Sequence, residues 1–166
     1  MNNQNIYDNQ QFFNGYLTLR ERDNNYNNLL EQPAMQDLLP NLNGKSVLDL
    51  GCGYGYNCLD FVHRGAARVV GLDISEKMLE IAKRESGDKS IDYVNMSMTE
   101  ISSLSEKFDF IYSSLAFHYI KDFTKLIKQI YELLNYNGDL LYSQEHPIVT
   151  ATIDGKGHFN RDENGH

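Results

Sequence analysis

The sequence lacks several features that would place it in large functional classes. Its 166 residues include only 15 Lys and Arg against 23 Asp and Glu, which gives a net charge of −8, and the basic residues are scattered. Nucleic-acid binding needs clustered positive charge against phosphate, so we expect no nucleic-acid partner. No apolar run approaches the roughly 20 residues of a membrane span, and the polar amino terminus does not read as a leader. These absences favour a cytoplasmic protein without membrane association.

Cysteine is also scarce. Cys52 and Cys58 stand six residues apart, without further Cys or His at the spacing of metal ligands. We therefore expect neither a metal site nor a disulfide framework, and we expect both thiols to be reduced. No internal repeat is visible, and the length suits the core of one domain.

The most informative stretch that is present covers residues 46–56, with the sequence SVLDLGCGYGY. Its apolar run predicts a buried parallel strand, and the glycine-rich turn after it lets the backbone approach a ligand without obstruction by Cβ atoms. Residues 57–63 have helical character, which places the free amides of a helix N-terminus beside the turn. This combination is typical of a nucleotide-type pocket.

Two carboxylates sharpen the prediction. Asp73 ends a second apolar run about 20 residues downstream, the usual position of an acid that binds both ribose hydroxyls. Asp49 precedes the first glycine, and the third glycine comes one residue earlier than in the dinucleotide pattern G-x-G-x-x-G. An anion beside the turn suits a cationic ligand better than a pyrophosphate.

At this point the sequence resembles the class I S-adenosylmethionine-dependent methyltransferases, in particular the small-molecule, methyltransferase type 11-like members. Four motifs in the family's order carry the resemblance: VLDLGCGYG (47–55), GLDIS (71–75), FDFIYSSLAFHYI (108–120) and LLNYNGDLL (133–141). The resemblance implies a Rossmann-like fold, S-adenosylmethionine as cofactor, S-adenosylhomocysteine as product, and in-line methyl transfer to a small-molecule acceptor.

Alternating strand and helix patterns predict a doubly wound α/β sheet, mostly parallel, with five strands. The expected strands lie at 47–50, 69–72, 91–94, 108–112 and 140–143, with helices at 29–39, 57–63, 76–86 and 122–135. Within the last of these helices Leu134 is expected to point inward, and Gly138 is expected to stop it. Members of the family usually have two more strands, for which we see no counterpart. We therefore expect the fifth strand to be an exposed edge that favours self-association.

Three segments are expected along the chain. Residues 1–28 are rich in Asn and contain a candidate helix that either docks on the core or lies over the cofactor pocket. Residues 29–147 form the methyltransferase domain. The Gly- and Asn-rich tail, residues 148–166, is expected to be loop or disordered.

The resemblance also implies a cofactor site at the carboxyl ends of the strands. A structural role for Asp49, as a cap on the glycine turn, stays open beside its expected place near the methionine amino group. The expected cofactor-binding residues are Asp49, Gly51, Cys52, Gly53, Asp73, Ile74, Met78, Ser97, Met98, Ser114 and Leu115, with Phe13, Tyr16 and Arg20 from the N-terminal segment.

His118 and His146 follow the fourth and fifth strands and are the candidates for removing a proton from the acceptor. A lone His is more often a hydrogen-bonded structural residue, and a base is optional because the methyl donor is already activated. Asp109 begins its strand, on the edge away from the site, so we expect a structural role. Two other functions stay open: a non-catalytic domain that binds S-adenosylmethionine or S-adenosylhomocysteine and acts through a partner, and a dinucleotide-dependent oxidoreductase.

Overall fold

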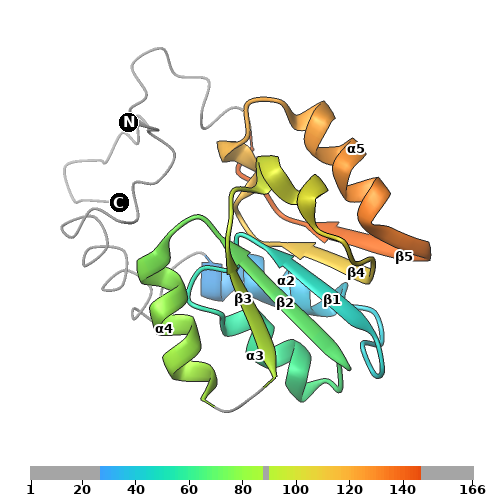
Figure 1. Ribbon diagram of the computed structural model, residues 1–166. Coiled ribbons are helices and arrows are strands. Elements are labelled where there is room, and N and C mark those ends of the chain that lie inside the picture. Colours follow the sequence, from blue (N-terminus) through green and yellow to red (C-terminus); the bar gives the residue numbers. More distant parts are fainter. Residues whose placement is uncertain (1–26, 88–89, 147–166) are drawn as a thin grey trace, which may run out of the picture.

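The computed structural model describes residues 27–87 and 90–146, which form one parallel sheet with helices on both faces (Figure 1). The strand order is β3-β2-β1-β4-β5, and every neighbouring pair is parallel. This confirms the doubly wound sheet. The strands are β1 (Ser46–Leu50), β2 (Arg68–Asp73), β3 (Ile91–Asn95), β4 (Phe108–Ser113) and β5 (Leu134–Tyr142).

The helices agree with the expected positions, with one difference near the amino end. The single helix expected at 29–39 is a π-helical turn followed by a short α-helix, and two 3₁₀ segments after β3 and β4 were not expected. The helical elements are η2 (Asn27–Glu31), α2 (Gln32–Asp37), α3 (Tyr56–His63), α4 (Glu76–Ser86), η3 (Met98–Ser103), η4 (Phe117–Tyr119) and α5 (Phe123–Leu133). Among the described residues, no helix has the length and apolar character needed to cross a membrane.

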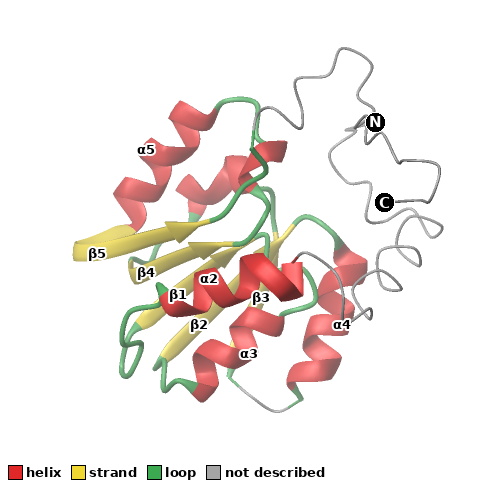
Figure 2. Cartoon of the chain, turned by 180° about the vertical axis from the view of Figure 1, so that it is seen from behind, coloured by secondary structure: helices red, strands yellow, loops and turns green. Residues whose placement is uncertain are grey.

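Two apolar clusters hold the helices on the sheet, one on each face (Figures 1 and 2). Successive side chains of a strand point to opposite faces, so the apolar run of β1 supplies both clusters. Val47 packs with Phe61 of α3, while Leu48 and Leu50 pack with Leu126 of α5. Burial on both faces explains why β1 reads as a nearly continuous apolar run.

Helix α5 and strand β5 meet differently from the expectation. The helix ends at Leu133, and Leu134 is already extended and pairs with Phe108 of β4. Gly138 lies inside β5, where a Cβ atom would come within 3.0 Å of the carbonyl oxygen of Asn135. The register shifts next to this point, so Gly138 allows close backbone approach at an irregularity of the sheet. The expected helix stop at Gly138 and the helical assignment of Leu134 are therefore wrong.

Strand β5 pairs with β4 on one side, and no other described strand pairs with its outer edge. The expected edge position of β5 is thus seen within residues 27–87 and 90–146. Self-association through that edge stays a prediction, as do the boundaries proposed for the segments 1–28, 29–147 and 148–166.

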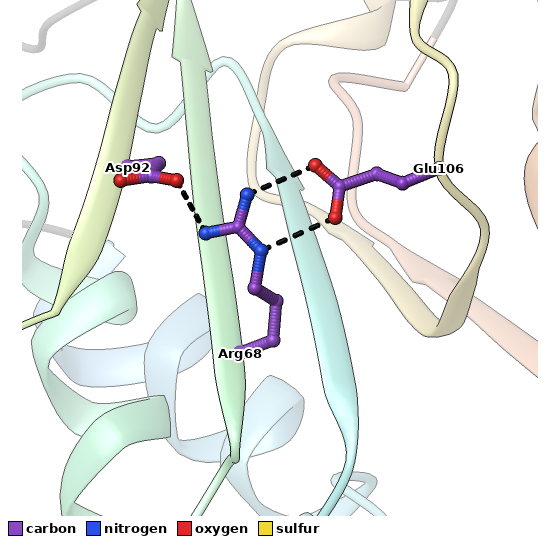
Figure 3. A network of polar contacts seen from close by, with 3 residues as sticks. All are labelled: Arg68, Asp92 and Glu106. Atoms are coloured by element: carbon purple, nitrogen blue, oxygen red, sulfur yellow. Dashed lines mark hydrogen bonds and ion pairs between the residues drawn. The ribbon is translucent and has the colours of Figure 1, made fainter.

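An ion-pair network joins three segments where β2 begins (Figure 3). The Arg68 guanidinium donates to both carboxylate oxygens of Glu106, at 2.9 and 3.2 Å, and also contacts Asp92 of β3. These side chains are 38–63% exposed, so solvent screens their attraction and the network adds little stability. It lies at the amino end of the sheet, away from the strand ends predicted to bind ligand.

Asp109 joins a second polar network at the amino end, as expected for a structural residue. One carboxylate oxygen accepts hydrogen bonds from the backbone N–H and the hydroxyl of Ser46, both at 2.9 Å, and the other accepts one from the Asn135 amide at 2.9 Å. The network joins the beginnings of β1, β4 and β5. These bonds, led by that from the Ser46 backbone, lower the pKa of Asp109.

We predict that Asp109→Asn lowers the free energy of unfolding by about 1–2 kcal/mol at pH 7, because the charge-assisted bonds are lost. A lowered pKa in the folded state stabilises the protein above the ordinary value of 3.8, and this gain disappears as the pH falls through the lowered pKa. Urea unfolding at pH 7 and at pH 3.5 should therefore show parent and variant converging in acid. A difference of the same size at both pH values would contradict this explanation.

Candidate functional site

A cavity of about 560 Å³ opens at the carboxyl ends of β1 to β4. Gly51 follows β1, Asp73 ends β2, Ser97 follows β3 and Ser114 follows β4, and all four line it. The strand order reverses between β1 and β4, which is where open parallel sheets bind ligands. The volume lies within the range of small-molecule sites, about 300–1,000 Å³.

Most of the residues expected to bind the cofactor meet in this cavity. Phe13, Tyr16 and Arg20 lie outside the described residues, and their role stays a prediction. The predicted residues that line the cavity are Gly51, Cys52, Gly53, Asp73, Ile74, Met78, Ser97, Met98, Ser114 and Leu115.

The glycine turn has the backbone conformation that its sequence predicts. Gly51, Gly53 and Gly55 have φ angles of +77°, +54° and +83°, which side chains other than glycine rarely adopt. A Cβ atom at Gly51 would lie 2.6 Å from that of Ala116, whereas a Cβ atom at Gly53 would meet nothing within 4 Å. Gly51 therefore permits tight packing, and Gly53 leaves its side of the turn open to a ligand.

Asp73 ties this turn to the end of β2. One carboxylate oxygen accepts the N–H of Gly53 at 2.9 Å, and the other accepts the N–H of Ser75 at 2.8 Å. A carboxylate oxygen has two lone pairs, so each oxygen can accept a further hydrogen bond from a ligand. The loop-to-loop bonds hold the carboxylate in place before any ligand arrives.

Asp49 lies beneath the cavity and does not line it. The residue is 1% exposed, and one carboxylate oxygen accepts from the Cys58 thiol at 3.4 Å while the other has no partner in the described part of the chain. Burial raises the pKa of Asp49 to about 7; the Cys58 bond opposes the shift, and the charge of Asp73 adds to it. The sequence suggested an anion beside the turn, but Asp49 is a buried acid that is only partly ionised at neutral pH.

Both cysteines are free and buried. Burial raises the pKa of each thiol above its ordinary value of 9.0, so neither forms the thiolate that a nucleophile or metal ligand requires at neutral pH. Residues 27–87 and 90–146 contain no group of His, Cys, Asp and Glu suited to a metal ion.

The two candidate histidines have different surroundings. His118 lies in η4 and lines the cavity, and its Nδ1 atom is buried without a hydrogen-bond partner among the described residues. Burial lowers the pKa of His118, although the charge of Glu145 opposes the shift, so the imidazole is neutral at pH 7 and can accept a proton. His146 is exposed and does not line the cavity.

Several cavity residues were not expected from the sequence. Tyr54 and Tyr56 alternate with the glycines, and Asn57 begins the following helix, so proximity to the motif could have identified them. The residues from η2, α2 and the segment after β5 carry no comparable local signal. The unexpected lining residues are Asn27, Asn28, Gln32, Tyr54, Tyr56, Asn57, Leu72, Met96, Ala116, Tyr119, Ile120 and Glu145.

Glu31 connects the amino-terminal helices to the ends of β4 and β5. Its Oε1 atom accepts hydrogen bonds from the hydroxyls of Ser114, at 2.7 Å, and Ser143, at 2.5 Å. The Ser143 hydroxyl also accepts the N–H of Leu115 at 3.0 Å, which supports the φ of +50° at Leu115. These bonds fix the part of the cavity wall that follows β4.

Comparison with known proteins identifies a family model described as a methyltransferase domain, which matches residues 47–138. An uncharacterized protein of Haemophilus influenzae is 44% identical over 165 residues, covering 94% of this chain and 64% of that protein. The trans-aconitate 2-methyltransferase of Deinococcus radiodurans is 30% identical over 126 residues, 71% of this chain and 47% of that enzyme.

Solved structures give the same result. An assigned S-adenosylmethionine-dependent methyltransferase from Listeria monocytogenes is 38% identical, with a TM-score of 0.73, over 82% of this chain and 63% of that one. Its counterpart from Mesorhizobium loti is 36% identical, with a TM-score of 0.70, over 78% of this chain and 58% of that one. The chain thus spans less than two thirds of the length of each of these four proteins.

We predict that Asp73→Ala weakens binding of S-adenosylhomocysteine at least about 10-fold while the chain stays folded. The change removes the proposed ribose acceptor, and a hydrogen bond to a charged group contributes about 1.5–3 kcal/mol. Titration calorimetry gives the affinity, and thermal unfolding reports whether the fold is kept. Asp92→Ala, an acid at the amino end of the sheet, is the control. Unchanged affinity in the Asp73 variant would refute the ribose assignment.

Proposed function

Because this chain belongs to the methyltransferase domain family, we propose that it transfers the methyl group of S-adenosylmethionine to a small-molecule acceptor. The observation that carries the proposal is the shared cavity: the glycine turn, Asp73 and the ends of four parallel strands meet there. The matched residues, 47–138, span β1 to β4 and continue into β5, so the family match covers the elements that form the cavity.

The residues present suit the cofactor. Gly53 leaves open space beside the turn, and Asp73 offers two fixed carboxylate oxygens to a pair of ribose hydroxyls. Ile74 and Met78 line the same cavity and provide an apolar surface for an adenine ring. Bound S-adenosylmethionine would supply a methyl carbon activated by the neighbouring sulfonium charge.

The chain's own contribution is chiefly orientation. Holding two reactants in an aligned geometry can lower a barrier by about 7–11 kcal/mol. The bonds of Asp73 to Gly53 and Ser75, and those of Glu31 to Ser114 and Ser143, give the cavity fixed walls on two sides. Neutral His118 is placed to take a proton from the acceptor.

A small acceptor fits the size of the cavity, and relatives point to the same class. The Deinococcus relative is named for trans-aconitate, and another, from Ilyobacter polytropus, is a malonyl-[acyl-carrier protein] O-methyltransferase that is 31% identical over 101 residues. A nucleic-acid acceptor is disfavoured by the net charge of −8. The acceptor and the roles of individual residues are part of this proposal.

We predict that the chain binds S-adenosylmethionine and S-adenosylhomocysteine and does not bind NAD. The early third glycine and the acid that precedes the turn motivate the prediction. Calorimetric titration with the three ligands under one set of conditions tests it. Heat from NAD alone would overturn the proposal in favour of the oxidoreductase.

We predict that His118→Ala lowers methyl-transfer turnover and leaves the affinity for S-adenosylhomocysteine nearly unchanged, because the imidazole acts on the acceptor. General-base catalysis contributes about 10²–10⁴-fold where it is used. Single-turnover measurements with labelled methyl donor give the rate, and calorimetry gives the affinity. His63→Ala, at the exposed end of α3, is the matched control. Equal loss of rate and affinity in the His118 variant would make it a structural residue.

A further inference from the structure

We propose that the methyl acceptor of this site is an amine and not a carboxylate. The inference rests on the proposed methyl transfer and adds the chemical class of the acceptor. It starts from the part of the cavity that lies beyond the predicted cofactor residues. This part, here called the acceptor side, is formed by Gln32, His118, Tyr119, Ile120 and Glu145.

The charge of the cavity is negative. Among the described lining residues the charged side chains are Asp73 and Glu145, and none of these residues is Lys or Arg. Glu31 lies directly behind the wall, hydrogen-bonded to Ser114. His118 adds no positive charge at neutral pH. A carboxylate acceptor would therefore meet like charge without a cation to offset it, whereas an ammonium group would be attracted.

The unpaired polar atoms of the cavity residues agree with this charge. Asn57 is only 8% exposed, and its Oδ1 atom has no hydrogen-bond partner in the described part of the chain. The Oε1 atom of Gln32 and the Nδ1 atom of His118 are buried without a partner in the same way. The two amide oxygens can only accept, and a neutral imidazole nitrogen can also accept. A ligand with N–H groups can satisfy such atoms, while a carboxylate, which only accepts, cannot.

The acceptor side also has suitable contacts for an ammonium group on an apolar carrier. Glu145 provides the charge, and the partly exposed ring of Tyr119 offers a face of the kind that binds cations. Ile120 and the neighbouring Ala116 and Leu115 provide apolar surface for the rest of the molecule. Charge and hydrogen-bonding chemistry thus select for the same group and against its anionic counterpart.

The step balances without a further reactant. The bound ammonium gives a proton to His118, and the freed nitrogen lone pair forms a bond to the methyl carbon. The bond between that carbon and sulfur breaks, and its electron pair remains on sulfur. The products are a methylated ammonium and S-adenosylhomocysteine, and His118 then releases its proton to solvent.

The test uses matched probes that differ in the charged end. The amines are benzylamine, 2-phenylethylamine and tyramine, and the carboxylates are phenylacetate and 3-phenylpropionate. Each is titrated into the full 166-residue chain saturated with S-adenosylhomocysteine, and each is incubated with labelled S-adenosylmethionine and the chain. We expect binding and methyl transfer with at least one amine and with neither carboxylate.

Substitution of Glu145 tests the charge directly. Glu145→Gln should lower kcat/KM for the amine at least about threefold, a modest loss because the side chain is solvent-accessible. Glu145→Lys should lower it further, and neither change should alter the affinity for S-adenosylhomocysteine. Glu106→Gln is the matched control, since it makes the same change in the network at the amino end of the sheet.

The outcomes separate this inference from the proposed function. Absence of S-adenosylhomocysteine binding would refute the proposed function and this inference with it. Binding of S-adenosylhomocysteine with methylation of a carboxylate, with no amine methylated, or with an unchanged kcat/KM in both Glu145 variants would overturn the amine assignment alone.

Discussion

The hydrogen bond between the Asp73 carboxylate and the N–H of Gly53 is the interaction on which the site depends. It joins the turn after β1 to the end of β2, and a second bond to Ser75 holds the start of α4 to the same carboxylate. The parallel register of β1 and β2 brings Leu50 beside Leu72, so the two strand ends reach the same edge together. The position of every predicted cofactor residue in this region follows from that alignment.

The parts of the fold and site that the sequence predicts are those encoded by neighbouring residues. A buried strand that runs into glycines predicts both β1 and the positive φ angles of the turn, because few other residues adopt that conformation. The N-caps at Ser75 and Asp122 likewise combine a short polar side chain with the helix that follows it. For this reason the predicted residues at the ends of β1, β2, β3 and β4 are also found in the cavity.

The parts that the sequence does not predict depend on residues far apart in the chain. Glu31 bonds to Ser114 and Ser143, which are 83 and 112 residues away, and no periodicity identifies such a pair. Glu145 reaches the cavity only because β5 lies beside β4. The assignment of Leu134 to a helix fails for the same reason: pairing with Phe108 outweighs the local helical pattern. The burial that raises the pKa of Asp49 is also a property of the folded state.

The direct passage from Leu133 of α5 to Leu134 of β5 has a consequence for how this fold diversifies. With no loop between helix and strand, an inserted residue there would shift the pairing with β4, so this end of the molecule has little room for variation in length. The segments that leave β4 and β5 at the opposite end lie in loops, where changes of length and sequence are better tolerated. New acceptor specificities can therefore evolve at the carboxyl edge while the scaffold beneath them stays unchanged.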